Sequence, residues 1–386
     1  MKKSGMYMPQ IRGYKAFIPT PLPPEITIDE NMFNKLNQAN KLLNQLNSIS
    51  EFLPNTDLFI SMYVKKEALL SAQIEGTQAS LQDVFEFEQC EYDFDKDIEN
   101  LKNINDIEEV INYIKALNYG IKRLEDLPMS LKLIKELHKI LLDNACGADK
   151  TPGEFKKTQN WIGLAGCTLN EAKFVPPSPE DSVQAMGDLE LYMHKKNNLP
   201  ELIKCALIHY QFETIHPFLD GNGRLGRLLI TFYLYWRGIL TKPLLYISYY
   251  FKKNKQEYYD RLNMVRDKDD YEQWILFFLD SIIKTSESAL ADIKKILELK
   301  EKDQNILFKN KISSPLAIVL LNKLFYMPLI SIKDIQKALE IGYQTASDII
   351  EQFERIGILK EITGKKRNRK FVYAEYLNIL SQGTQL

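Results

Sequence analysis

The sequence predicts a mainly α-helical protein with one β-hairpin in its middle and a small C-terminal domain of short helices and a second hairpin. Apolar residues recur at spacings of three and four along most of the 386-residue chain, which is typical of amphipathic and buried helices. Short aromatic and β-branched runs flank turn residues between positions 159 and 176, and the pattern changes again after residue 300. We therefore expect three regions, at residues 1–110, 111–300 and 301–386.

Composition limits the classes of function. With a net charge of −1, the chain is not drawn to nucleic acid or to a membrane by its overall charge. Four cysteines without a C-x-x-C pair argue against a zinc site or a disulfide framework and are expected to be reduced thiols: Cys90, Cys146, Cys167 and Cys205. Prolines rather than an apolar run follow Met1–Lys3, and no apolar stretch reaches membrane-spanning length. We therefore expect a cytoplasmic protein without a membrane partner.

The N-terminal region is predicted to be an arm followed by helices. Residues 1–25 contain several prolines and are expected to be extended or irregular. Helical spacing then covers Thr27–Leu53 and Asp57–Ser71. The second helix leads into Glu75 and Gly76, and from the residues alone Glu75 is a surface or capping residue, since glycine commonly ends a helix. Helical spacing continues through residues 81–87, 98–117 and 131–142.

A hairpin is predicted over residues 159–176. Gln159–Gly163 and Ala172–Val175 have the composition of strands, and the segment between them contains turn residues. An isolated hairpin is marginally stable by itself, so this one either covers the helical core or has a function of its own.

The most informative stretch is Ile215–Ile230, which reads I-H-P-F-L-D-G-N-G-R-L-G-R-L-L-I. It lies between a predicted helix and a further apolar helix. Gly221, Asn222 and Gly223 allow the backbone to approach an anion closely. The start of the next helix offers unpaired N–H groups and a positive dipole end to the same anion.

Charged side chains in this stretch suit a polyphosphate. Arg224 and Arg227 are three residues apart on one helix face, so both can reach phosphates. Asp220 is a hard oxygen ligand beside them, where a Mg²⁺ ion bridging phosphates is expected. His216 can accept a proton from a hydroxyl group. This set indicates nucleotidyl or phosphoryl transfer.

Two other histidines are expected to be structural. His138 lies on the apolar face of its predicted helix. His209 precedes His216 by seven residues, about 10 Å of helix rise, which is too far for the two to share one metal ion.

The segment His216–Arg227 resembles the signature of the Fic family, H-x-F-x-[D/E]-G-N-G-R-x-x-R, at every defined position. Most members of that family transfer AMP from ATP to a hydroxyl side chain of a target protein. The resemblance implies a Fic-type helical core in which His216 is the general base and Asp220 binds Mg²⁺. It also implies that the ATP-binding residues are Gly221, Asn222, Gly223, Arg224, Arg227 and Tyr259, with Arg227 on the γ-phosphate and Tyr259 in the adenine site.

The segment Ser71–Gly76 resembles the inhibitory motif of the same family, [S/T]-x-x-x-E-[G/N], in the subclass that carries it N-terminal to the core. The resemblance implies that Glu75 pairs with Arg227 and denies the γ-phosphate its partner, while Ser71 holds the helix in place. A buried, bidentate pair of this kind is strong once formed. The resemblance also makes the 159–176 hairpin a flap over the active site, whose backbone docks a target segment as an added strand.

The C-terminal region follows a long predicted helix over residues 270–311. Short helices over residues 316–324, 331–339 and 345–356 precede a hairpin whose tip is the basic run Lys365–Lys370. This order resembles a winged helix-turn-helix, a module that binds DNA or protein. Acidic residues on the third helix leave both partners open. DNA bound through residues 331–373 would have its phosphates on the basic wing.

The sequence therefore favours an autoinhibited protein adenylyltransferase that acts on a Ser, Thr or Tyr hydroxyl of a target protein and of itself, with ATP as substrate and Mg²⁺ as cofactor. Two alternatives stay open. One is a de-AMPylating hydrolase in which Glu75 orients water, and the other is a nucleotide-sensing DNA-binding regulator. The sequence does not define the target protein, the nucleotide base or whether the chain forms a homodimer.

Overall fold

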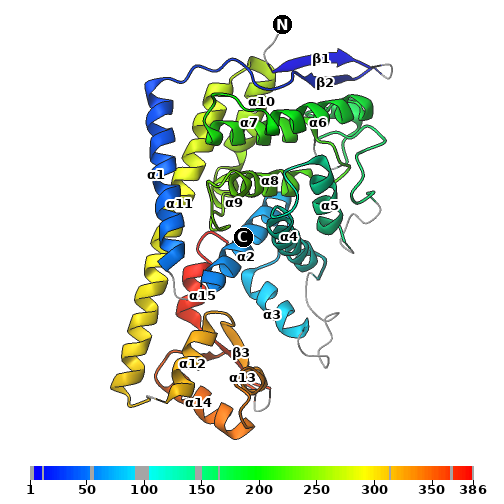
Figure 1. Ribbon diagram of the computed structural model, residues 1–386. Coiled ribbons are helices and arrows are strands. Elements are labelled where there is room, and N and C mark those ends of the chain that lie inside the picture. The colour runs from blue at the N-terminus through cyan, green and yellow to red at the C-terminus, as the bar shows by residue number, and fades with distance from the viewer. Residues whose placement is uncertain are drawn as a thin grey trace.

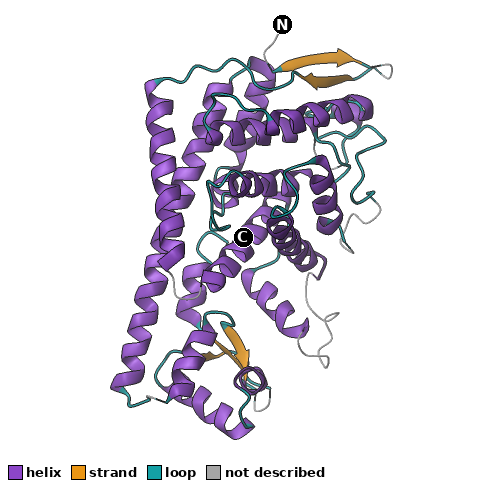
Figure 2. Cartoon of the chain, in the orientation of Figure 1, coloured by secondary structure: helices purple, strands orange, loops and turns teal. Residues whose placement is uncertain are grey.

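A computed structural model shows a helical body with a small antiparallel sheet at each end (Figures 1 and 2). The residues that the structure describes are 4–10, 13–52, 56–91, 104–143, 150–163, 166–312, 314–365 and 368–384. Several residues named above lie outside these ranges: Met1–Lys3, Leu53, Cys146, Lys366 and Arg367, together with the side chain of Cys90. The predicted mainly α-helical fold class is confirmed.

The N-terminal arm is extended and, over residues 20–25, irregular, as expected, but the pairing of its first part into a β-hairpin was not predicted. Strand β1 (Gly5–Pro9) pairs antiparallel with β2 (Lys15–Pro19). The prolines lie at strand ends, where a missing N–H interrupts no ladder of hydrogen bonds. Phe17 of β2 is buried, and its N–H donates to the carbonyl of Val175 at 2.9 Å, which joins the hairpin to the end of the predicted flap.

Two long helices form one side of the body. Helix α1 (Glu30–Phe52) packs along α11 (Tyr271–Lys309), and Lys35 of α1 forms an ion pair with Asp280 of α11. Helix α11 continues past α1 towards the C-terminal domain (Figure 1).

The centre of the body is a pair of buried helices, α7 (Glu201–Ile215) and α8 (Asn222–Trp236). Every residue of α7 from Leu202 onwards is buried, as expected for a helix that is covered on all sides. The surrounding helices are α2 (Thr56–Glu75), α3 (Leu81–Glu91), α4 (Ile104–Arg123), α5 (Leu131–Leu141), α6 (Pro179–His194), α9 (Ser248–Lys253) and α10 (Lys255–Lys268). Of the helices that the structure describes, none is long and apolar enough for a bilayer span.

The predicted flap hairpin is reduced to one β-bridge. Ile162 and Phe174 exchange two backbone hydrogen bonds, of 2.8 and 3.0 Å. In the described part of this segment, the pairing does not extend beyond this bridge. Thr168 and Glu171 form a capping box around a 3₁₀ turn, η2 (Leu169–Glu171). The turn takes up residues that a longer hairpin would need for pairing.

The C-terminal domain contains the three predicted helices and the predicted hairpin. They are α12 (Pro315–Leu324), α13 (Ile332–Leu339), α14 (Tyr343–Arg355), β4 (Lys360–Glu361) and β5 (Lys370–Val372). A short strand β3 (Leu329–Ser331) and a last helix α15 (Ala374–Leu380) are additional, and the sheet has the order β3-β5-β4.

Basic residues of the predicted wing have carboxylate neighbours within the chain. Arg369 lies 3.4 Å from Glu351 of α14, and Lys370 lies 3.7 Å from Glu86 of α3. DNA binding therefore stays a prediction, and these two ion pairs would compete with phosphate contacts at the wing.

Candidate active site

The signature residues form the turn between α7 and α8. His216 ends α7 in the left-handed conformation, with φ 48° and ψ 59°, and Gly221 precedes α8 at φ 73°. A left-handed histidine is uncommon, and backbone strain of this kind clusters at functional sites. The turn borders a pocket of about 430 Å³ whose lining includes His216, Asp220, Arg224 and the Gly221–Gly223 backbone.

Two asparagines hold the turn in shape. Asn222 Oδ1 accepts a hydrogen bond from the Phe218 N–H at 2.9 Å, and Asn222 Nδ2 donates to the Phe218 carbonyl at 2.8 Å. Asn160, at the base of the flap, donates to the carbonyls of His216 (3.1 Å) and Phe218 (2.7 Å). The Asn222 side chain is used to close the turn. A phosphate can therefore bind only to the backbone N–H of this residue, which lies in the first turn of α8.

Lys156 is a site residue to which sequence reasoning gave no role. Its Nζ donates to the carbonyls of Ile215 (3.4 Å) and His216 (3.1 Å) and to Asn160 Oδ1 (2.8 Å). Burial lowers the pKa of Lys156 to about 7. The amine therefore caps the last carbonyls of α7 beneath the turn. Its place in Lys156-Lys157 gave little sign of this, because adjacent lysines are normally exposed.

His138 is buried, as expected, and it also holds the turn. Its Nδ1 accepts from the N–H of Gly153 at 2.8 Å, which leaves a proton on Nε2 to donate to the Asp220 carbonyl at 3.0 Å. Its ring stacks on Phe218 with 3.7 Å between centroids. Burial lowers the pKa of His138 to about 4, so the ring is neutral at physiological pH.

The imidazole of His216 is also neutral. Burial lowers its pKa to about 3, and the positive charges of Lys156 and Arg266 act in the same direction. Its Nδ1 is buried without a hydrogen-bond partner among the described residues. A neutral ring is the form that can accept a proton from a substrate hydroxyl.

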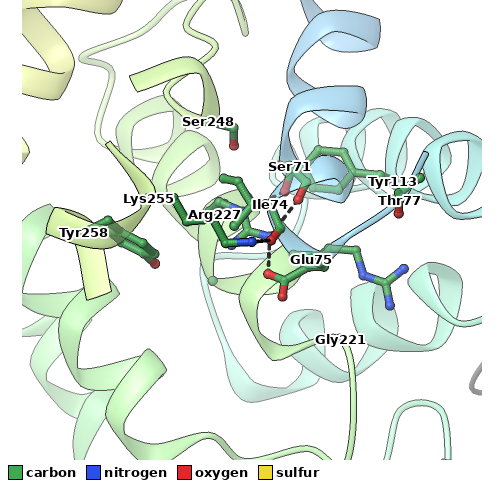
Figure 3. Close-up of polar contacts among 12 residues, drawn as sticks. Ser71, Ile74, Glu75, Thr77, Tyr113, Gly221, Arg227, Ser248, Lys255 and Tyr258 are labelled. Atoms are coloured by element: carbon green, nitrogen blue, oxygen red, sulfur yellow. Dashed lines mark hydrogen bonds and ion pairs between the residues drawn. The ribbon is translucent and has the colours of Figure 1, made fainter. Parts of the chain in front are cut away.

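Arg227 is buried and engaged by the end of α2 (Figure 3). Its Nε donates to Ser71 Oγ at 2.8 Å, and its Nη2 donates to the Ser71 carbonyl at 3.0 Å and to Glu75 Oε1 at 2.6 Å. Burial lowers the pKa of Arg227, but the Glu75 carboxylate, together with Tyr258, Glu213 and Tyr259, raises it by more, so the net shift is upwards.

The predicted ion pair is present, but its predicted geometry is wrong. One nitrogen of Arg227 contacts one oxygen of Glu75, whose side chain is 39% exposed, so the pair is neither bidentate nor buried on both sides. Ser71 takes the Nε donor and one Nη2 donor of the guanidinium, so a side-on pair through Nε and Nη2 is not open to the carboxylate.

Two glycines make room for Glu75. Gly76, at φ 115°, ends α2 in a conformation that other residues rarely adopt. A Cβ atom on Gly223 would lie 2.3 Å from Glu75 Oε1 and 3.1 Å from Arg227 Nη1. The Glu75 carboxylate therefore lies against the backbone at the start of α8, the position predicted for bound phosphates.

Arg224 has a carboxylate partner that the sequence did not indicate. Its Nη1 lies 3.4 Å from Glu109 of α4 and its Nη2 lies 4.0 Å from Asp220. The same Glu109 oxygen accepts a hydrogen bond from Thr77 Oγ1 at 2.8 Å. Helix α4 thereby links the segment that follows Glu75 to the first turn of α8.

The surroundings of Asp220 fit Mg²⁺. Its side chain is 44% exposed and borders the pocket. Among the described residues, no group of three or more His, Cys, Asp or Glu side chains is placed to hold a metal ion. A single carboxylate still suits Mg²⁺, which commonly takes one or two protein carboxylates together with substrate phosphates.

A further buried carboxyl group, that of Glu213, interacts with the charge of Arg227. Burial raises the pKa of Glu213 to about 7, against the charge of Arg227, and Glu213 Oε1 has no hydrogen-bond partner in the described part of the chain. Tyr259 is half-buried near the same charges, and its role at an adenine site stays a prediction.

His209 is structural, as expected. Its two ring nitrogens lie 2.9 Å from the Gly226 carbonyl and 2.9 Å from the Tyr258 hydroxyl, so it joins α7, α8 and α10.

This geometry defines a class of protein in which a histidine, a helix N-terminus and an arginine line one pocket, with a second, buried arginine on the same helix. Comparisons with known proteins then define the family. A family model described as Fic/DOC family N-terminal matches residues 33–122, and one described as Fic/DOC family matches residues 128–234, so the two matches cover about half of the chain. The chain belongs to the Fic family.

Curated relatives and a solved structure agree with this assignment. Protein adenylyltransferase Fic of Drosophila grimshawi is 30% identical over 187 residues, which are 48% of this chain and 35% of that protein. The protein of the same name from Drosophila mojavensis is 28% identical over 225 residues, 55% of this chain and 41% of that protein. The match thus spans less than half the length of these relatives.

The fold itself is confirmed by a Fic family protein from Desulfovibrio desulfuricans G20. That structure superposes with a TM-score of 0.58 at 17% identity and covers 91% of this chain and 98% of its own.

Proposed function

We propose that this chain transfers AMP from ATP to a Ser, Thr or Tyr hydroxyl of a target protein and of itself. The observation that best supports this proposal is the neutral His216 beside the first turn of α8, in a pocket with Arg224 and Asp220. The names of the Drosophila relatives support the choice of AMP as the transferred group.

In the proposed reaction, the hydroxyl oxygen of the target attacks the α-phosphorus and the bond to the β-phosphate oxygen breaks. His216 takes the hydroxyl proton, and pyrophosphate leaves. The N–H groups of Gly221–Gly223 and the guanidinium of Arg224 bind the phosphate oxygens. Lys156 and His138 keep the turn in place, so the donors need little rearrangement during the reaction.

Asp220 is the residue that would hold Mg²⁺. When bound, the ion neutralises phosphate charge and favours the departure of pyrophosphate. Chelation of Mg²⁺ is expected to abolish transfer.

We further propose that the form described here is autoinhibited by Glu75. Its carboxylate takes Arg227 and lies against Gly223, so the γ-phosphate lacks both a partner and space. Release of α2 from Arg227 would open the position for ATP.

The mass of the modified protein tests the reaction. Glu75→Gly protein incubated with ATP and Mg²⁺ is expected to gain the mass of AMP on a hydroxyl residue, and Glu75→Gly/His216→Ala protein is expected to gain nothing. A gain of phosphate would make the chain a kinase. If a protein already carrying AMP lost it only when Glu75 was intact, the hydrolase alternative would replace this proposal.

A further inference from the structure

A groove separate from the pocket at the signature turn lies between α5, α6 and residues 152–157, the segment that leads into the flap. Its volume is about 980 Å³, more than twice that of the pocket at the signature turn. Its apolar lining includes Leu131, Phe155, Pro179 and Val183, and Val183 is 52% exposed. An exposed groove of this kind suits an extended peptide with apolar side chains.

Lysines dominate the charged lining. Three of them, Lys132, Lys135 and Lys139, recur at spacings of three and four and so share one face of α5. Lys157 also lines the groove, whereas the ammonium group of the buried Lys156 is turned to the carbonyls at the end of α7. Lys135 lies over the Phe155 ring at 4.5 Å. Among the residues that the structure describes, Lys132, Lys139 and Lys157 are exposed and make no ion pair.

Carboxylates in the groove do not balance these lysines. Glu136 is turned towards α4, where its Oε2 accepts from Tyr119 Oη at 2.9 Å and Arg123 Nε at 3.3 Å. Glu154 and Glu180 also line the groove and are exposed, so two carboxylates stand against Lys132, Lys135, Lys139 and Lys157. The groove therefore favours an anionic occupant, and its apolar floor favours a peptide over a simple polyanion.

The groove shares a wall with the signature turn. The N–H of Lys156 donates to the Pro217 carbonyl at 2.8 Å, and Phe155 packs on Phe218 with 5.2 Å between ring centroids. The flap begins two residues after Lys157, and its Trp161 and Ile162 are exposed. A chain that lies along the flap can therefore continue into the groove without crossing a gap in the fold.

We propose that this groove binds an acidic segment of the target protein, next to the segment that presents the acceptor hydroxyl. The proposal rests on the proposed AMP transfer, because that reaction requires a protein target near the flap. It adds a substrate class: proteins in which the modified hydroxyl has Asp or Glu residues nearby in the same extended chain.

Peptide binding tests the groove without ATP and thus independently of transfer. The probes are a fluorescein-labelled peptide with glutamates at alternate positions around a threonine and valines, and a second peptide with glutamine at each glutamate. Fluorescence anisotropy is measured with the wild type, with Lys132→Glu/Lys139→Glu, and with Lys284→Glu/Lys294→Glu. The last variant makes the same charge change at exposed positions of α11, on the other side of the body (Figure 1).

The acidic peptide is expected to bind the wild type and the α11 variant alike, and the groove variant about tenfold or more weakly. The glutamine peptide is expected to bind weakly to all three. Equal binding to the groove variant, or equal loss in the α11 variant, would overturn the proposal. So would tighter binding of single-stranded DNA than of the acidic peptide to the same lysines, because the groove would then be a nucleic-acid site. Circular dichroism confirms that each variant is folded, and AMP transfer is scored separately in the Glu75→Gly background.

Discussion

Single residues around the signature turn have separable roles. His216 is the proposed base, whereas Lys156 and Asn160 donate hydrogen bonds to its carbonyl and to those of its neighbours. These residues position the turn without touching the reacting atoms in the arrangement described here. Their substitution should therefore affect the rate of the chemical step more than the binding of ATP.

Lys156 offers the clearest test of such positioning. In the Glu75→Gly background, Lys156→Met is expected to lower kcat by about tenfold or more while the KM for ATP changes little, since helix-end carbonyls lose their cap. Lys156→Arg, which keeps a donor at this position, is expected to retain most of the activity. A change confined to KM in steady-state transfer assays would show that Lys156 binds nucleotide instead.

The Glu75–Arg227 contact makes a prediction about nucleotide choice. If Glu75 occupies the position of the γ-phosphate, Glu75→Gly should tighten the binding of ATP and leave that of ADP nearly unchanged. Isothermal titration with both nucleotides in the presence of Mg²⁺ measures the difference. The same gain for ATP and ADP would mean that Glu75 blocks another part of the pocket.

Packing between elements fixes the helices that carry these residues. Gly120 of α4 lies against α8 and α5, and a Cβ atom there would be 2.3 Å from the Phe232 ring and 3.0 Å from Leu137. A Cβ atom added to Gly187 of α6 would have no other atom within 4 Å. The two glycines are a matched pair within helices.

Gly120→Ala is expected to destabilise the fold by about 1–3 kcal/mol through overpacking. Gly187→Ala is expected to stabilise it by about 0.5–1 kcal/mol, because alanine is the better helix former. Urea unfolding measures both free energies of unfolding. Equal effects of the two substitutions would show that α4 does not pack on α8 as described.

A buried carboxyl joins α2, α4 and α9. Glu67 accepts hydrogen bonds from the Ser248 N–H and hydroxyl and from the Tyr113 hydroxyl. Burial raises the pKa of Glu67 from 4.5 to about 7, although these hydrogen bonds favour the charged form. The folded state therefore holds a proton that the unfolded state releases between those two pH values.

Because the folded state binds this proton more tightly than the unfolded state, the free energy of unfolding should fall as pH rises. The contribution of Glu67 to stability is fully present below pH 4.5 and is lost as pH rises towards 7. Relative to Glu67→Gln, the wild type should lose up to about 3 kcal/mol across that interval. Denaturant unfolding at a series of pH values gives the difference between the two proteins. Parallel curves, or a wild type that gains stability as pH rises, would contradict the assignment.

At the scale of the whole molecule, the C-terminal segment reaches helix α2, which carries Ser71 and Glu75. Gln73, between Ser71 and Glu75 on α2, donates its side-chain amide to the carbonyls of Ala79 and Thr384, each at 3.0 Å. Lys252 of α9 donates to Gln73 Oε1 at 2.7 Å. The C-terminal segment is thereby connected to the Glu75–Arg227 contact, the proposed inhibitory contact.

Truncation after Leu380 should therefore remove one of the two acceptors of the buried Gln73 amide and destabilise the end of α2 by about 1–3 kcal/mol. Faster AMP transfer than in the wild type is the expected consequence, measured by incorporation of α-labelled ATP. Gln382→Ala, at an exposed residue of the same segment, is the control and should leave transfer unchanged. If the truncated protein transferred AMP no faster than the wild type, the C-terminal segment would have no role in inhibition.

The sequence predicted the features that depend on local patterns. Continuous helical spacing located the long helices, and the signature located the turn at His216. The β1–β2 hairpin was not predicted, because prolines usually indicate irregular chain, whereas here they lie at strand ends and interrupt no hydrogen bonds of the ladder. The strands of the flap were predicted to be longer than they are, because a 3₁₀ turn occupies the middle of this segment. Lys156 and Glu109 gave no signal, since their partners are distant in the chain and only the packed helices bring them to the site.

The rate of AMP transfer by Glu75→Gly relative to wild type, measured with α-labelled ATP and Mg²⁺ at equal protein concentration, tests the central claim most directly. The account predicts a rise of about tenfold or more, since freeing Arg227 restores a charge-assisted contact to the γ-phosphate. It also predicts that His216→Ala removes the activity gained. Equal rates for the wild type and Glu75→Gly would contradict autoinhibition by Glu75, and the absence of label on both proteins would contradict AMP transfer itself.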